Sequence, residues 1–122
     1  MKVKITKEIE VPSEIMVGDV PIPISKDPSM INRAEYQGWL NMVDSDRWGN
    51  VNIIIDLKTM AYTVYLDYGS KQTEDGESVL ITGKVRSLTP MHLNRVIGNE
   101  IIRAYPFIET MDDPRLKQNK RR

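Results

Sequence analysis

The residues best suited to chemistry lie in one short stretch, KVRSLTPMHLNR. It combines cations, hydroxyl groups and the one histidine of the chain around a predicted helix start, and its candidate ligand-binding residues are Lys84, Arg86, Ser87, Thr89, His92 and Arg95. A helix start has backbone N–H groups that lack intrahelical acceptors, and these bind anions together with nearby cations. The stretch therefore predicts an anion site, with phosphate as the natural ligand. The simpler alternative is that Thr89 and Pro90 only cap the helix and that the charges around them are solvated.

Two aromatic residues outside this stretch are candidates for stacking on a base. Tyr65 is on the more polar side of its predicted strand, and Trp48 lies in a predicted loop. Aromatic rings bind nucleobases by stacking on their faces. Together with the phosphate-binding cluster they predict a nucleotide-like ligand. The chain has neither the P-loop pattern nor the dinucleotide-binding glycine pattern, so the site would be of another type.

Few residues in this chain could support catalysis. Cysteine is absent and His92 is the one histidine, so a Cys-His pair is excluded and a Ser-His-Asp triad has a single candidate base. Asp44 and Asp46 resemble the start of a calcium-binding loop, but Trp48 and Ile55 stand where that loop needs oxygen ligands. We therefore expect a non-catalytic protein with no metal and no other cofactor.

Charge and hydropathy narrow the class of partner. Among 122 residues, 17 are Lys or Arg and 17 are Asp or Glu, so no net field attracts nucleic acid. The start of the chain has no apolar core of signal-peptide length, and no run reaches the roughly 18–20 apolar residues of a membrane span. We expect no nucleic acid polymer and no membrane as partner. The lack of cysteine is typical of a cytoplasmic protein. For a phage-encoded chain, this compartment would be the cytoplasm of the host.

The structural centre is predicted to be a β-hairpin over residues 50–68, NVNIIIDLKTMAYTVYLDY. Apolar residues alternate with polar ones on both limbs, and a short polar break separates the limbs, which is the pattern of two paired strands. The break has no Asn-Gly or Asp-Gly, so a four- or five-residue turn is expected. The alternation places Tyr62, Val64, Leu66 and Tyr68 in the core, with Tyr65 on the opposite face.

Further strands are predicted on both sides of this hairpin. Val3–Val11 has the alternation of one amphipathic strand, and Glu14–Val17 with Val20–Ile24 could form a second hairpin. Pro21 and Pro23 cannot donate ladder hydrogen bonds, so they place Val20–Ile24 at a sheet edge, where it could also bind a partner. Glu77–Val85 is expected to pair with the second limb of the central hairpin, with its glycine marking a bulge or a close backbone approach.

Two helices are predicted. Asn32–Val43 has apolar residues at i, i+3, i+4 and i+7 and a possible capping pair at its start. Pro90–Tyr105 begins with Thr89 as N-cap, carries an apolar stripe, and ends before Pro106. The predicted fold is therefore α+β: an antiparallel sheet of about four to six strands around hairpin 50–68, with both helices on one face. Residues 1–108 would form a single domain, and residues 109–122 a polar tail with a basic end.

Two functions from different classes follow from these patterns. The first is a non-catalytic binding protein for an anionic, nucleotide-like small molecule; a phage-type protein that sequesters a host defence signalling nucleotide is one concrete form. The second is a protein-interaction module without a small-molecule ligand, such as an inhibitor of a host protein or a phage assembly subunit. The aromatic residues and the exposed sheet also predict a homo-oligomer, with a dimer as the simplest form.

Overall fold

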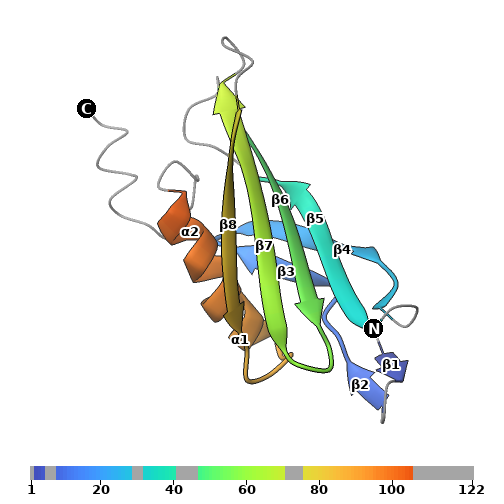
Figure 1. Cartoon of the computed structure of the whole chain (residues 1–122). Coiled ribbons are helices and arrows are strands. Elements are labelled where there is room, and N and C mark those ends of the chain that lie inside the picture. The colour runs from blue at the N-terminus through green and yellow to red at the C-terminus, as the bar shows by residue number, and fades with distance from the viewer. Residues whose placement is uncertain (1, 5–7, 29–31, 41–46, 71–75, 106–122) are drawn as a thin grey trace.

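The computed structural model describes residues 2–4, 8–28, 32–40, 47–70 and 76–105. Its main body is a curled, six-stranded antiparallel sheet, about half of a barrel, with one helix of 15 residues on the inner side (Figure 1). The strands of this sheet are β3 (Glu14–Val17), β4 (Val20–Lys26), β5 (Arg33–Trp39), β6 (Arg47–Asp56), β7 (Ala61–Ser70) and β8 (Gly76–Lys84). They are ordered in space as they are in sequence, so every connection joins neighbours.

The predicted central hairpin is confirmed as β6 and β7. Nine residue pairs run from Arg47–Ser70 to Ile55–Tyr62. The connection between the two strands has four residues, as expected. The Asp56 carboxylate stabilises this turn, because its Oδ1 accepts the backbone N–H groups of Lys58 at 2.8 Å and Thr59 at 3.0 Å. These two hydrogen bonds lower the pKa of Asp56, and the one from Thr59 has the larger effect.

Replacing Asp56 with alanine is expected to lower the free energy of unfolding by about 0.5–1 kcal/mol, because two hydrogen bonds are lost at an exposed, solvent-screened site. Asp56→Asn keeps an acceptor oxygen without the charge. Because the folded-state pKa is lowered, the charge stabilises the fold above the unfolded-state value of about 4, and this contribution is lost as the pH falls through the folded-state pKa. Chemical denaturation between pH 7 and 2 should show the wild type lose its advantage over Asp56→Asn only below about pH 4. An advantage independent of pH would contradict this account.

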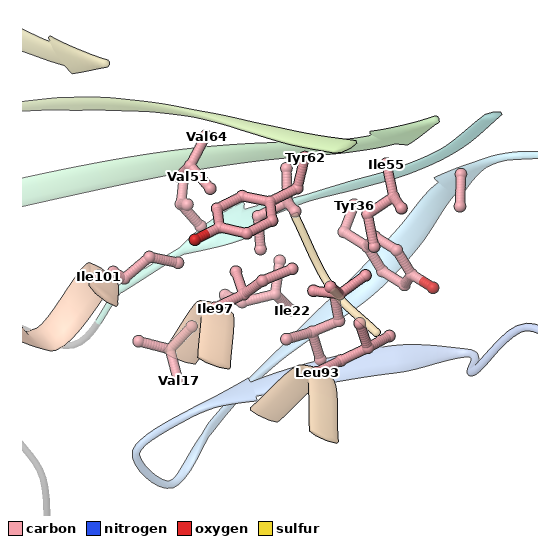
Figure 2. Packing of buried hydrophobic residues seen from close by; sticks show 14 of the residues in the cluster. Val17, Ile22, Tyr36, Val51, Ile55, Tyr62, Val64, Leu93, Ile97 and Ile101 are labelled. Atoms are coloured by element: carbon pink, nitrogen blue, oxygen red, sulfur yellow. The ribbon is translucent and has the colours of Figure 1, made fainter. Parts of the chain in front are cut away.

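The inner faces of the strands and one face of the helix form a single core. Alternate residues of β6 and β7 point inward and are fully buried, as the sequence predicts for Val64 and Leu66, and Tyr62 is 5% exposed. Figure 2 shows Val51, Tyr62 and Val64 of the sheet on the side that faces Ile97 and Ile101 of the helix. Tyr36 is also buried, and its hydroxyl donates to the carbonyl of Pro12 at 2.8 Å. Burial raises the pKa of Tyr36 well above its usual range.

The third strand of the predicted meander is also confirmed. β8 pairs with β7 through nine consecutive residue pairs, from Ala61–Lys84 to Gly69–Gly76. The glycine in β8, Gly83, allows a close approach: a Cβ atom there would lie 2.6 Å from Cζ of Tyr62. Tyr62 therefore covers the glycine from the opposite strand, and a side chain at position 83 would displace that ring.

The helix predicted at Asn32–Val43 is wrong. Residues 33–39 form strand β5, which pairs with β6 over seven residues, and Asn32 is in a turn with a positive φ of 53°. Tyr36 is fully buried whereas Trp39 is 64% exposed, so the burial follows strand parity instead of the helical stripe. The reason is that β6 offers a long unpaired edge, and pairing with it overrides a weak local helix preference that includes a glycine. Residues 41–43 lie outside the described part of the chain.

Two details of the N-terminal third also differ from the prediction. Val3–Val11 is not one strand: β1 (Lys2–Lys4) and β2 (Glu8–Glu10) pair with each other as a separate two-stranded sheet. The hairpin of β3 and β4 is confirmed, but β4 lies between β3 and β5 and is not an edge. Its prolines are accommodated because Ile24 donates its N–H to Ser13, so the alternation directs the nitrogens of Pro21 and Pro23 away from β3. On that side the ladder to β5 begins only at Ile24. The segment predicted to be a partner-binding edge, Val20–Ile24, therefore lies inside the sheet, and the edge strand on this side is β3.

The predicted second helix is confirmed as a continuous helical segment made of α1 (Pro90–Leu93), a π-helical part η2 (Asn94–Gly98) and α2 (Asn99–Ala104). Thr89 is the N-cap, and its side chain accepts the N–H of His92. This segment covers the outer edge of β3: Asn94 Oδ1 accepts the N–H of Met16 at 2.7 Å. Among the described helices, none has the length and apolar character needed to cross a membrane.

Candidate functional site

The candidate site lies where the chain leaves β8 and enters the helix. Val85 is buried and its N–H donates to the Met60 carbonyl at 2.9 Å, which fixes the end of the strand. The next residue, Arg86, donates its backbone N–H to Nε2 of His92 at 3.1 Å. His92 is 9% exposed, so its ring forms a buried support under the connecting segment. Arg86 and the first helical turn are thereby held close together.

A hollow of about 350 Å³ opens at this junction. Its lining residues are Arg86, Ser87, Thr89, Met91, His92 and Arg95. Five of the eight residues predicted from the sequence therefore surround one space. Within the part of the chain that the structure describes, no ion pair links either guanidinium group to a carboxylate, whereas Arg33 and Arg103 each have a glutamate partner. Two exposed positive charges therefore face a common hollow with no internal counter-charge there.

The hydrogen bonding of His92 leaves the Arg95 guanidinium group available. Because Nε2 accepts the Arg86 N–H, the neutral ring carries its proton on Nδ1. Nη2 of Arg95 lies 3.5 Å from Nδ1, and a protonated Nδ1 cannot accept a hydrogen bond from it. The arginine is therefore placed against the ring without being held by it, and its N–H donors can reach a ligand.

The backbone at the helix start offers less to an anion than the sequence suggested. The N–H of Thr89 donates to the Ser87 hydroxyl at 3.0 Å, and the N–H of Leu93 donates to the Thr89 carbonyl. The N–H of His92 donates to the Thr89 hydroxyl. Pro90 has no N–H, so among positions 89–93 only Met91 retains a backbone donor without a described acceptor. The cap uses the donors that the prediction assigned to a phosphate, and recognition here would depend mainly on the two arginine side chains.

Two of the predicted site residues that the structure describes, Lys84 and Tyr65, do not line this hollow. Lys84 is exposed at the end of β8 and does not line the hollow. Tyr65 is 48% exposed on the outer face of the sheet, opposite Asn52 and Leu80, as its parity predicted, but it is not among the lining residues. The side chain of Trp48 lies outside the described part of the structure. The two residues predicted to stack on a base therefore have no demonstrated place at the site.

One lining residue was missed by the sequence interpretation. Met91 is 78% exposed, so its flexible apolar side chain forms one wall of the hollow without belonging to the core. The signal was present, because an apolar residue in the first turn of a helix, between Pro90 and His92, falls outside the stripe that begins at Leu93. An exposed methionine next to two arginines suits a ligand with both an anionic and an apolar part.

No protein family, curated protein or solved structure that was compared matches this chain. The function must therefore be argued from the geometry of the site.

A second, larger cavity of about 590 Å³ lies on the other side of Thr89. Its lining includes Val11 and Pro12 from the segment between β2 and β3, Met16 of β3, and Leu88 and Pro90 at the helix start. Glu10 and Glu14 are also in its lining, so its charge is opposite to that of the arginine hollow. The two hollows share Thr89 but differ in charge. The arginine hollow suits an anion, whereas the larger cavity is more apolar and has acidic residues in its lining.

The arrangement around the arginine hollow is suited to binding. The His92 nitrogen that could act as a base accepts a backbone hydrogen bond, and the nearby hydroxyls of Ser87 and Thr89 bond to each other at 2.9 Å. In the described ranges of the chain, no three residues of the types that hold metals are grouped together. The charged groups here that have no described carboxylate partner are the two guanidinium groups, which are suited to attracting and orienting an anion.

Proposed function

We propose that this protein binds a small molecule through a phosphate or similar anionic group in the hollow between Arg86 and Arg95, without catalysing a reaction. The observation that carries the proposal is the pair of arginines, without a described carboxylate partner, on the two sides of one hollow. Guanidinium groups bind phosphate in a bidentate manner, and two of them give both affinity and orientation. The Ser87 hydroxyl donates to the Thr89 hydroxyl, which keeps its own proton to donate to the anion.

The size and lining of the hollow favour a small ligand or one part of a larger one. Its volume of about 350 Å³ is near the lower end of the range for small-molecule sites. Met91 provides an apolar wall next to the cations. A nucleotide remains a suitable ligand by its phosphate, but its base would have to contact Met91 or leave the hollow, because Tyr65 is elsewhere on the molecule.

The experiment is isothermal titration calorimetry of the purified protein with nucleoside mono- and diphosphates, cyclic dinucleotides and inorganic phosphate. Mass spectrometry of small molecules released from the protein would identify a co-purified ligand. For a phosphate-bearing ligand, Arg86→Ala and Arg95→Ala are each expected to weaken binding about 10- to 100-fold, since a charge-assisted hydrogen bond contributes roughly 1.5–3 kcal/mol. Affinity should also fall as the salt concentration rises.

A matched control is available on the same helix. Arg103 is exposed and its Nη1 pairs with Oε1 of Glu100 at 3.0 Å, so Arg103→Ala removes an equal charge away from the hollow. It should change the affinity less than about twofold, because a surface charge at that distance is largely screened. The proposal fails if none of these compounds binds and none is released, or if Arg103→Ala weakens binding as much as Arg86→Ala.

A further inference from the structure

The two outer edges of the six-stranded sheet are treated differently by the fold. On β3, the helix covers the edge: Asn94 binds the N–H of Met16, and Gly98 lies so close that a Cβ there would be 2.6 Å from the Met16 carbonyl oxygen. On the other side of the sheet, β8 is the last strand (Figure 1). The outer backbone groups of β8 therefore have no strand partner within this sheet.

The direction of those groups follows from one hydrogen bond. The N–H of Val85 donates to the carbonyl of Met60, so Val85 points its backbone groups toward β7. In an antiparallel ladder this direction alternates along the strand. The register of β7 and β8 is unbroken, so Ser78, Leu80, Thr82 and Lys84 point their N–H and C=O groups away from β7. No described residue outside the sheet ladders forms a backbone hydrogen bond with these outward N–H and C=O groups.

The side chains along this edge lack the features that prevent strand addition. Edge strands are normally protected by prolines, bulges, central charges or a covering element. β8 has no proline and no register shift over nine pairs. Its central residue is Leu80, which is 61% exposed on the outer face beside Tyr65, itself 48% exposed. The helix part α2 lies near β8, but among the described residues none pairs with this long, regular edge and its apolar centre.

We propose that β8 is the interface for a second copy of this chain, which adds its own β8 in antiparallel orientation around a twofold axis at Leu80. In this register Leu80 faces Leu80 of the second copy, Ser78 faces Thr82, and Val79 faces Ile81. The two sheets then form one continuous sheet, with each helix on the same inner side. The interface is isologous, which is the commonest symmetry of soluble oligomers.

The strand is complementary to itself in this register. Residues that face each other across an antiparallel ladder lie on the same side of the sheet, so apolar residues meet apolar residues and hydroxyls meet hydroxyls. The backbone groups of Ser78, Leu80 and Thr82 gain hydrogen-bond partners, which no described residue of the single chain supplies. Lys84 of each copy also comes close to the Ser78 end of the other copy's β8. There the Ser78 hydroxyl donates to Oδ1 of Asp67 in its own chain at 2.5 Å, so a lysine and an aspartate of opposite charge approach each other at both ends of the interface. This interface is independent of the anion site and could be present without it.

The first test is the solution mass of the full chain by sedimentation velocity between about 1 and 100 µM, a range that reaches weak protein–protein interactions. A dimer is expected, and Leu80→Glu and Thr82→Pro should convert it to a monomer. Thr82→Pro removes an N–H that points away from β7, so the ladder within the chain is preserved. Met91→Glu introduces the same charge at another exposed apolar residue and should leave the dimer intact. Circular dichroism must show that each variant remains folded.

The second test determines the register. The chain has no cysteine, so Leu80→Cys introduces a single thiol on the proposed axis. Facing Cα atoms in a hydrogen-bonded antiparallel pair are about 5.5 Å apart, within the range that a disulfide spans. Mild oxidation should therefore cross-link Leu80→Cys, whereas Lys84→Cys should stay unlinked, because the axis separates the two Lys84 positions by about 27 Å at the strand rise of about 3.4 Å. A monomer at every concentration, a dimer that Leu80→Glu leaves intact, or a Leu80→Cys dimer that mild oxidation does not cross-link would overturn the proposal.

Discussion

Ile101→Ala is expected to lower the free energy of unfolding by about 2–5 kcal/mol. Ile101 is fully buried in the helix and packs into the core against inward-facing residues of the sheet (Figure 2). Removing three carbon atoms loses their transfer free energy and leaves a cavity that a rigid sheet cannot fill. The measurement is chemical denaturation followed by circular dichroism, with the midpoint and the slope fitted separately.

The adjacent residue is a matched control. Ile102 has the same side chain in the same helix, but it is only partly buried at the margin of the core. Ile102→Ala should therefore cost clearly less than Ile101→Ala, because less of its side chain is buried while the gain in helix propensity is the same for both variants. Equal losses for the two variants would mean that the helix does not present Ile101 to the sheet as the structure describes.

Gly98→Ala is expected to destabilise the protein by about 1–3 kcal/mol, although alanine normally stabilises the interior of a helix by up to about 1 kcal/mol relative to glycine. The sign is reversed because the new Cβ would lie 2.6 Å from the carbonyl oxygen of Met16. That oxygen belongs to the backbone of β3, so it cannot move away as the end of a flexible side chain would. The helix would have to shift off the strand, and the 2.7 Å hydrogen bond of Asn94 with Met16 would be strained.

A control for helix propensity lies one residue further on. Asn99 is exposed in the same helix, and Asn99→Ala should raise stability by a few tenths of a kcal/mol, or about 0.5 kcal/mol at most. If Gly98→Ala is also stabilising, the close approach of the helix to β3 does not exist in solution. Thermal and chemical denaturation of both variants decide between these outcomes.

The parts of the fold that the sequence predicts correctly are those with strong local patterns. The hairpin of β6 and β7 has alternation on both limbs and a polar break, and the helix at Pro90 has a cap, a proline and an apolar stripe. Residues 33–39 have a weaker pattern that fits a helix by its spacing of apolar residues. Their strand conformation depends on pairing with β6, which is a non-local interaction that periodicity does not report.

The candidate site follows the same division. Arg86, Ser87, Thr89, His92 and Arg95 are close in sequence and span a strand end and a helix start, so their meeting around one hollow could be predicted. Tyr65 and Trp48 are far from them along the chain. Their position depended on how the sheet curls and on which face the helix covers, and Tyr65 is on the outer face.

By itself the sequence determined the hairpin, the cap of the helix, the absence of cysteine chemistry and the local clustering of cations, because each depends on neighbouring residues and on side-chain type. Only the tertiary structure decided that residues 33–39 are a strand and that the helix covers the edge of β3, while no described residue pairs with the outer edge of β8. It also decided that the cap uses most of the backbone donors expected for an anion. These features depend on contacts between distant segments. Their free energy is set by which edges and faces are left to pair once the strongest local elements have formed.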